Sequence, residues 1–467
     1  MRTVRHCDQG GAPIGLTCVH DPFQCKVSSR KSHYSHMLLV RNLLFALISA
    51  SPIILLFDGL ILQGLIAGFL AVSLAATAAA LRPGEAGFLV VILRPLLVIA
   101  VVPALWILLQ IISLGILVHP IWNSAQMAVG HPIVGHITID PALSLIALGQ
   151  YLSLIAVAYL TAAIAVDRQR AEWILFALTI AVTFISLIVI THVLFLRGPW
   201  LGVSQRIAAI ECVSLGTIVA ATACIRAIER YETRRARGQT EPNEGKAIIA
   251  CGVALLICVT AFALDANHEV LFATGYGLLT LAYVLIIRRF GLGLLGTAVM
   301  TVPAIWIAGV LVTAHPAPRD ISLPLTFAGQ SSPRLMSLSE RMLDDAPILG
   351  TGAGTFAALA PLYREIDDPP SDSPAPTAAG AVAIELGKPM LWLIVAATIG
   401  LMLLLLRASL MRGRDSFYPA MTGSCLLTLL LMGFTSSGVL ETVPALLAST
   451  VLGLGLAQRT SRKTSEP

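Results

Sequence analysis

Runs of about twenty consecutive apolar residues recur along this chain from residue 37 almost to its end. A helix of roughly 20 residues is long enough to cross the ~30 Å hydrocarbon core of a bilayer. Of the 467 residues, 56% are hydrophobic and only 12% are charged, whereas about a quarter of the residues in a soluble domain are charged. The sequence therefore predicts an all-α, polytopic membrane protein and excludes a soluble fold.

We predict about twelve transmembrane helices, nine within residues 37–314 and three within residues 389–458, separated by a large loop at 315–388. The predicted spans are 37–57, 59–81, 92–114, 143–166, 173–196, 207–226, 247–265, 270–287, 291–314, 389–407, 418–434 and 440–458. Residues 1–36 are expected to form a disordered tail and residues 459–467 a second tail. Met37 opens directly onto the first span, so a start at Met1 and a start at Met37 both fit the sequence.

Lys and Arg resist translocation, so the segments rich in them are expected to stay in the cytoplasm. The densest cluster of these residues lies in the linker 226–246. With that linker inside, both termini are cytoplasmic, and the loops 119–144 and 315–388 lie on the outer side. The net charge of +5 then reflects membrane topology, and we expect no nucleic-acid partner.

Five of the eight cysteines lie in predicted spans, and Cys7, Cys18 and Cys25 lie in the first tail beside several histidines. No cysteine lies in an outer loop, so the outer side has no disulfide framework. A zinc site in the tail is an alternative to plain disorder, but the tail has no CxxC pair and no apolar core to support one. We therefore expect neither a metal ion nor a cofactor.

A short amphipathic helix is predicted in the large loop, in the stretch SSPRLMSLSERMLDD. Ser332 is a natural N-cap, Pro333 suits the first helical position, and Pro347 ends the helix. Its apolar side carries Leu335, Leu338, Met342 and Leu343, and another side carries Arg334, Arg341, Asp344 and Asp345. Such a helix is able to lie flat on a membrane with both guanidinium groups facing one way. The alternative is an ordinary solubilising pair of Arg341 and Asp345, four residues apart.

Three glycines, Gly350, Gly352 and Gly354, follow this helix in DDAPILGTGAGTF. Glycine adopts positive φ and lets the backbone approach a ligand, and successive N–H groups can form an anion-binding nest. A nucleotide-binding P-loop is excluded because no lysine follows and no strand precedes the glycines. We expect a tight turn at the membrane surface, with the three glycines as candidate substrate-binding residues.

The stretch RLMSLSERMLDDAPILGTGAGTF resembles the signature of the O-antigen ligase and polymerase family. Downstream, AVAIELGKPMLWLIVAATIGLML resembles the family's approach to the next span. Upstream, GHITIDPALSLIALGQYLSLIAVAYLTAAIAVDRQRAEWILFAL resembles a stretch of its proteobacterial members. Together these segments cover roughly a third of the chain, in the expected order.

The resemblance implies a GT-C-like glycosyltransferase of the bacterial inner membrane, with the large loop in the periplasm. Such enzymes transfer a glycan from undecaprenyl pyrophosphate to a sugar hydroxyl, either on lipid A–core (ligase) or on another repeat unit (polymerase). The choice between ligase and polymerase stays open. The implied partners are the lipid-linked glycan, membrane lipid, a glycan or lipid A–core acceptor and other polysaccharide assembly proteins.

A departing pyrophosphate develops negative charge, which arginine side chains stabilise through paired hydrogen bonds. Arg334 and Arg341 are the leading candidates for this role. Arg206, in the predicted outer loop RGPWLGVSQR, is the third candidate, with a snorkelling residue at a span edge as the alternative.

The acceptor hydroxyl needs a base, and the histidine and the Ser-Arg pair typical of the family are missing from this sequence. A carboxylate is the substitute, and Asp372 and Asp368, beside Asp367, are the nearest; the alternative is that they are solvated loop acids. Two further outer-face pairs are candidates for substrate binding. His268 and Glu269 form one, with helix capping as the alternative; His192 and Glu211 form the other, with bundle stabilisation as the alternative.

Two other classes of function stay open. A transporter or flippase is one, although the chain shows no internal repeat of the kind that transporters usually have. A non-catalytic partner in a polysaccharide export complex is the other, because the family's histidine and Ser-Arg pair are missing.

Overall fold

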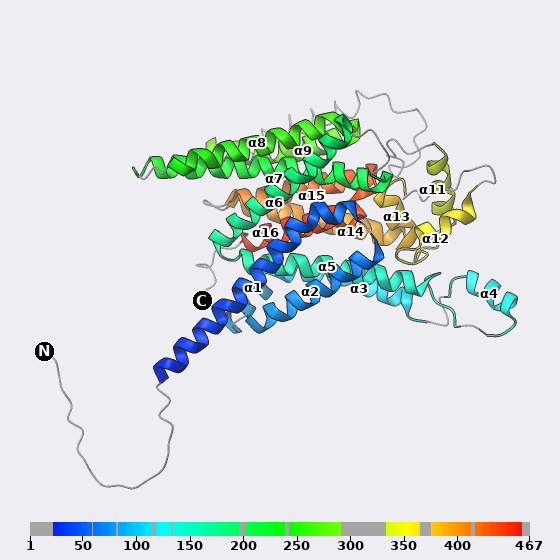
Figure 1. The fold of residues 1–467 in the computed structure, drawn as a ribbon. Coiled ribbons are helices and arrows are strands. Elements are labelled where there is room, and N and C mark those ends of the chain that lie inside the picture. Colours follow the sequence, from blue (N-terminus) through cyan, green and yellow to red (C-terminus); the bar gives the residue numbers. More distant parts are fainter. Residues whose placement is uncertain are drawn as a thin grey trace, which may run out of the picture.

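The computed structural model describes residues 22–57, 59–80, 83–113, 118–132, 134–195, 201–238, 242–290, 333–364, 375–411 and 416–459. Every regular element within these ranges is a helix, and the long helices run side by side in one bundle (Figure 1). The long helices are α1 (Pro22–Leu56), α2 (Leu60–Ala80), α3 (Pro83–Ile111), α5 (Pro141–Ala165), α6 (Arg168–Leu194), α7 (Val203–Arg235), α8 (Pro242–Asp265), α9 (His268–Phe290), α14 (Lys388–Met411) and α15 (Phe417–Thr435).

All ten of these helices are long and apolar enough to cross a membrane. Helix α16 (Thr442–Ala457) is also apolar but shorter. The predicted span 291–314 lies outside the described residues, as do Ser332 and the first part of the large loop. The prediction of an all-α, multi-pass membrane protein is confirmed.

Several helices extend past their predicted ends, and two of the extensions enter segments that were not expected to be helical. Helix α1 begins at Pro22, inside the tail that we expected to be disordered, and α7 continues to Arg235, into the predicted linker 226–246. Both extensions continue a helix that is already formed, and adding a residue to an existing helix avoids the cost of a new nucleus. The linker between spans is therefore shorter than the sequence suggested.

Helix α7 lies at the centre of the bundle and is buried along most of its length, where it packs against α6, α8 and α15. Small residues allow this close packing, as is usual between membrane helices. A Cβ atom on Gly216 of α7 would lie 2.9 Å from the Cβ of Val182 on α6. A Cβ atom on Gly453 of α16 would lie 2.3 Å from the backbone carbonyl oxygen of Ala158 on α5.

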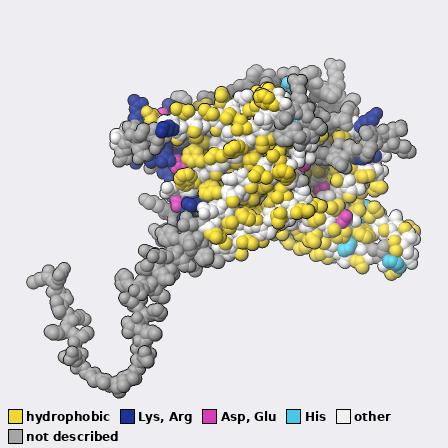
Figure 2. Space-filling view, in the orientation of Figure 1, with side chains coloured by type: hydrophobic (Ala, Val, Ile, Leu, Met, Phe, Trp, Pro, Cys, Tyr) yellow, Lys and Arg dark blue, Asp and Glu magenta, His cyan; other side chains and the backbone are white. Residues whose placement is uncertain are grey.

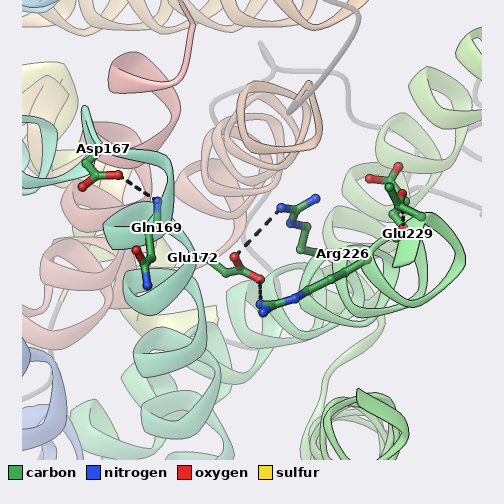
Figure 3. Close-up of polar contacts among 7 residues, drawn as sticks. Asp167, Gln169, Glu172, Arg226 and Glu229 are labelled. Carbon is green, nitrogen blue, oxygen red and sulfur yellow. Dashed lines mark hydrogen bonds and ion pairs between the residues drawn. The ribbon is translucent and has the colours of Figure 1, made fainter. Parts of the chain in front are cut away.

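One end of the bundle is basic. There Glu172 of α6 accepts a 2.7 Å hydrogen bond from Nη1 of Arg230 and lies 3.9 Å from Nη2 of Arg226 (Figure 3). The Arg226 guanidinium also lies 5.2 Å from the centre of the Phe417 ring. Dark blue side chains gather at this end, at the left of Figure 2. This is the end that the distribution of Lys and Arg predicts to be cytoplasmic.

The opposite end, which we call the loop end, carries the short helices. They are α4 (Ile121–Val129), α11 (Pro333–Asp345), α12 (Phe356–Leu359), the 3-10 helices η2 (Ala360–Tyr363) and η3 (Gly438–Leu440), and α13 (Ala378–Glu385). The prediction of a helix in the large loop is confirmed, beginning at Pro333 and ending before Pro347. Its apolar side, however, packs within the loop: Leu338 and Met342 are buried against Phe356 and Ile384. Because this side is already covered, it is not the surface by which α11 would lie on a membrane.

Candidate functional site

Three segments that are far apart in the sequence meet at the loop end, and we call their meeting point the loop junction. They are residues 136–144, 347–356 and 384–387. The Ile139 N–H donates to the Thr351 carbonyl at 2.9 Å, and the Thr351 N–H donates to the Ile384 carbonyl at 3.0 Å. These are the same three segments that carry the resemblance described above, so motifs chosen from the sequence converge in space.

Helix α3 supports the loop junction from the bundle. The Nε2 atom of the buried Gln110 donates to the carbonyls of Leu349, at 2.8 Å, and Glu385, at 3.0 Å. The indole Nε1 of Trp106, one turn earlier, donates to the Leu386 carbonyl at 2.9 Å. Two side chains of one membrane helix therefore fix both the glycine turn and the start of the next span.

The glycines of the turn have positive φ, as their sequence context predicts: 78° at Gly350, 115° at Gly352 and 76° at Gly354. Their N–H groups are used within the protein. The Gly350 N–H donates to the Pro347 carbonyl, the Gly352 N–H to the Glu385 carbonyl, and the Gly354 N–H to the Glu385 carboxylate. The three amides therefore shape the turn around residue 385 and do not form an open anion nest.

A cavity of about 320 Å³ lies between the loop junction and α11. Its lining residues come from four parts of the chain: His119, Pro120, Ile139, Met342, Asp345, Ala346, Pro347, Thr351, Leu359, Tyr363 and Ile384. Most of this lining is apolar, and the polar side chains are those of His119, Asp345, Thr351 and Tyr363. A concave, mainly apolar site with a few polar groups is the usual form of a small-molecule site. A second, larger cavity of about 610 Å³ lies between α6 and α8, but its lining is almost wholly apolar and lies within the spans.

His119 is half-buried, and burial lowers the pKa of its imidazole because it disfavours the charged ring. The Ile121 N–H donates to Nδ1 of this ring at 3.3 Å. In the neutral ring the proton therefore lies on Nε2. His119 is thus a neutral side chain with one N–H left to donate to a bound molecule.

Asp345 and Tyr363 both line this cavity, and their side chains interact. Burial, the neighbouring Asp345 charge and a hydrogen bond to Asp345 all raise the pKa of the Tyr363 hydroxyl, so this hydroxyl stays protonated and donates to the carboxylate. Asp345 itself is exposed, at the end of α11. An exposed carboxylate held at the edge of a cavity is able to accept a proton from a bound hydroxyl.

Arg334 and Arg341 are exposed on α11 and do not belong to the cavity lining. At 100° per residue, both lie on the same side of α11 as Asp345, with Arg341 one turn above it. The Nε atom of Arg341 donates to the Ser337 carbonyl at 3.3 Å. The two arginines therefore precede Asp345 on the same side of α11, and Asp345 is the residue of that side that lines the cavity.

Arg206 lies in the first turn of α7 and not in a loop as predicted, because α7 begins at Val203. Its guanidinium pairs with both carboxylate oxygens of Asp265 on α8, with Nε at 3.0 Å from Oδ2. The Asp265 side chain is only 5% exposed, whereas that of Arg206 is 53% exposed. The predicted third arginine of the site is thus committed to an ion pair between two spans.

The other candidate residues lie in separate places. Glu211 is 1% exposed and faces Ser436 and Gly438, in the turn between α15 and α16; its pairing with His192 stays a prediction. His268 and Glu269 form the start of α9, where Glu269 lies in the first turn, as the helix-dipole alternative requires. Asp367, Asp368 and Asp372 lie outside the described residues.

Glu385 is a central residue of the loop junction that sequence reasoning missed. It is partly buried, and its Oε1 accepts the Phe356 N–H at 3.0 Å. Burial raises the pKa of its carboxyl, and the N–H groups of Gly354 and Phe356 offset this only in part. In the sequence, Glu385 is part of the motif Glu-Leu-Gly, but no local pattern indicates that its carboxylate accepts hydrogen bonds from the glycine turn.

We expect Glu385→Gln to stabilise the protein at neutral pH. The folded-state pKa lies above the unfolded value of 4.5, so the folded protein holds this proton more tightly and stability falls as pH rises through that window. Glutamine keeps the acceptor oxygen without the charge. The thermal midpoint of Glu385→Gln in detergent should exceed that of the unsubstituted protein at pH ~7 and match it at pH ~4. An equal difference at both pH values would contradict the raised pKa.

His119, Gln110 and Tyr363 were missed for a similar reason. His119 opens the outer loop at 119–144, where it stands among other polar residues, and Gln110 is one polar residue within an apolar run. An isolated glutamine in a predicted span was the only available signal, because polar groups in a membrane need partners.

No family model matches this chain, and no curated protein matches it either.

Proposed function

We propose that this protein transfers a glycan from a polyprenyl pyrophosphate to a sugar hydroxyl at the loop end of the bundle. The observation that carries the proposal is the convergence of three motif-bearing segments on a cavity that holds His119, Asp345 and Tyr363. The cavity lies near the end of a membrane span, because Gln110 of α3 bonds to the carbonyl of Glu385, the residue after the lining residue Ile384. A substrate with a lipid tail and a polar head fits such a boundary.

In this reaction the acceptor hydroxyl oxygen attacks the sugar carbon bonded to the pyrophosphate. The new carbon–oxygen bond forms, the bond to the pyrophosphate breaks, and the electron pair of that bond leaves with the pyrophosphate. Asp345 takes the proton of the acceptor hydroxyl, and Tyr363 holds the carboxylate in place. Arg334 and Arg341, on the same face of α11, meet the charge of the leaving group. His119 donates from Nε2 to an oxygen of the bound substrate.

Asp345 thus takes the role for which Asp368 and Asp372 were the candidates from sequence. The exposed carboxylate beside the cavity favours it, as does its hydrogen bond to Tyr363. Ligase and polymerase activities use the same step and differ in the acceptor. The proposal therefore covers both.

Single substitutions on α11 test this function. We expect Arg334→Ala, Arg341→Ala and Asp345→Asn each to lower transfer about 100-fold or more, because each removes a charge that acts on the reacting groups. The length of surface polysaccharide on a gel and the amount of lipid-linked glycan on each leaflet are the measurements. The substrate should accumulate on the outer leaflet.

Glu340→Ala is the matched control, since Glu340 is exposed on the same helix but points away from the side that carries Arg334, Arg341 and Asp345. It should leave the polysaccharide unchanged. Normal polysaccharide in all three α11 variants, at normal expression, would rule out the catalytic role of this face. Accumulation on the inner leaflet would indicate a flippase, and turnover by the purified protein alone would exclude a merely structural partner.

A further inference from the structure

Helix α4 is an unusual element for a segment that lies outside the spans. It has no buried residue, and the sequence contains no Asp, Glu, Lys or Arg between Arg94 and Asp140. Helices that face water are normally charged on their exposed side. The part of the molecule around α4, at the lower right of Figure 2, accordingly shows yellow and cyan side chains.

The residues of α4 are arranged on two sides. At 100° per residue, one side carries Ile121, Trp122, Ala125, Ala128 and Val129, and the other carries Asn123, Ser124, Gln126 and the exposed Met127. The apolar side is partly covered at its start, but by its last turn the Val129 side chain is 54% exposed. Val134, shortly after the helix, is 66% exposed. The structure therefore leaves the far half of an apolar helix face uncovered.

A chain of contacts fixes the level of α4 relative to the membrane. The Thr138 N–H donates to the carbonyl of Gln110, in the last turn of span α3, at 3.1 Å. The Thr138 carbonyl accepts from Nε1 of Trp122, in the first turn of α4, at 3.0 Å. The Trp122 ring also packs edge-on against His136, with centroids 5.6 Å apart. Helix α4 therefore starts two hydrogen bonds away from the end of a membrane span.

We propose that α4 is a membrane-surface helix, and that its apolar side lies in the headgroup region of the lipid leaflet at the loop end. Three observations favour lipid over a protein or a second copy as the occupant. The apolar side has no charge for a partner to match, its indole stands at the level where tryptophan is enriched in membrane proteins, and spans α3 and α5 tether it from both sides. An amphipathic helix with its apolar face at headgroup level is the form of an interfacial helix, and α4 has such a face, although its polar side is uncharged.

The position of α4 in the membrane also affects the cavity. His119 and Pro120, immediately before α4, belong to the cavity lining. A helix held in the leaflet would keep that wall of the cavity at headgroup level. The inference stands on the contacts of α4 alone and does not depend on the proposed reaction.

Spin labels on the two sides of α4 test the proposal. Val129→Cys and Asn123→Cys each place a label on an exposed position, one on the apolar and one on the polar side. The full-length protein is labelled, placed in vesicles of phosphatidylethanolamine and phosphatidylglycerol, and compared with the unsubstituted protein to remove the signal of native cysteines. The measurement is the accessibility of each label to oxygen, which concentrates in lipid, and to a water-soluble nickel chelate.

We expect the label at 129 to favour oxygen over the nickel chelate several-fold more than the label at 123 does. Equal access of the nickel chelate to both labels would overturn the proposal. Broadening between labels that grows with protein density would also overturn it, because a second copy would then cover α4. Both variants should keep the thermal midpoint of the unsubstituted protein, which shows that any change in accessibility is not due to unfolding.

Discussion

Gly350→Ala is expected to open the loop junction, with a local loss of at least about 4 kcal/mol, which is exceptional for one substitution. A Cβ atom on Gly350 would lie 2.2 Å from the Glu385 carbonyl oxygen, 2.5 Å from the carbonyl carbon and 2.7 Å from the Gly387 nitrogen. All three are backbone atoms, so no side-chain rotation relieves the overlap. The φ of 78° adds roughly 1–2 kcal/mol for any residue with a Cβ.

Gly130→Ala is the matched control for this substitution. Gly130 has the same φ of 78°, but a Cβ there would have nothing within 4 Å. It should cost only about 1–2 kcal/mol, the ordinary penalty for left-handed backbone. Hydrogen exchange of residues 347–356 and the thermal midpoint in detergent measure both variants. If the two substitutions had equal effects, backbone conformation alone would account for Gly350, and the contact with residue 385 would be unimportant.

Gly453→Ala is expected to destabilise the bundle by about 3 kcal/mol, because it overfills a tight contact between helices. Its Cβ would lie 2.3 Å from the Ala158 carbonyl oxygen and 2.9 Å from the Thr161 Cβ, both on α5. To accept the methyl group, α16 would have to move away from α5. Gln458, at the end of α16, donates to the Ala165 carbonyl and would move with it.

Gly68→Ala on α2 provides the comparison. A Cβ at Gly68 would have nothing within 4 Å, so alanine there should be neutral or stabilise the helix by up to about 1 kcal/mol. The two substitutions make the same chemical change in two membrane helices, and only Gly453→Ala is expected to destabilise the protein. The midpoint of unfolding in increasing dodecyl sulfate is the measurement. Parallel shifts would show that α5 and α16 do not depend on this close approach.

The consequence of Gly350→Ala for transfer follows from the same contacts. Pro347 and Thr351, on either side of Gly350, line the cavity, and Ile384, before Glu385, lines it too. A junction that opens at Gly350 therefore displaces these three residues of the cavity wall. Stability and transfer should fall together in this variant, whereas Asp345→Asn should lower transfer with the thermal midpoint unchanged.

The local backbone features of the loop end could be predicted from the sequence, but its long-range contacts could not. The start of α11 at Pro333 and its end before Pro347 were predicted, as was the positive φ of the glycines, because both follow from local backbone rules. That the glycine N–H groups would already be used was not predicted. Their acceptors include the Glu385 backbone and side chain, which the sequence separates widely from the turn.

Arg206 shows the same limit within the spans. An arginine is suited to bind a pyrophosphate, and the sequence placed Arg206 on the same side of the membrane as the large loop. Its bidentate pair with Asp265 depends on how α7 packs on α8, across 59 residues of chain. No local pattern records that contact.

The sequence by itself determined that this protein crosses the membrane many times as helices. A long apolar segment in lipid has no water to bond its backbone, so within one segment only a helix satisfies it. Only the tertiary structure decided which polar groups meet, for example that Gln110 bonds to residue 385, 275 positions away. The reason is physical: backbone preferences act over a few neighbouring residues, whereas a site is built by packing segments whose separation along the chain carries no record of their distance in space.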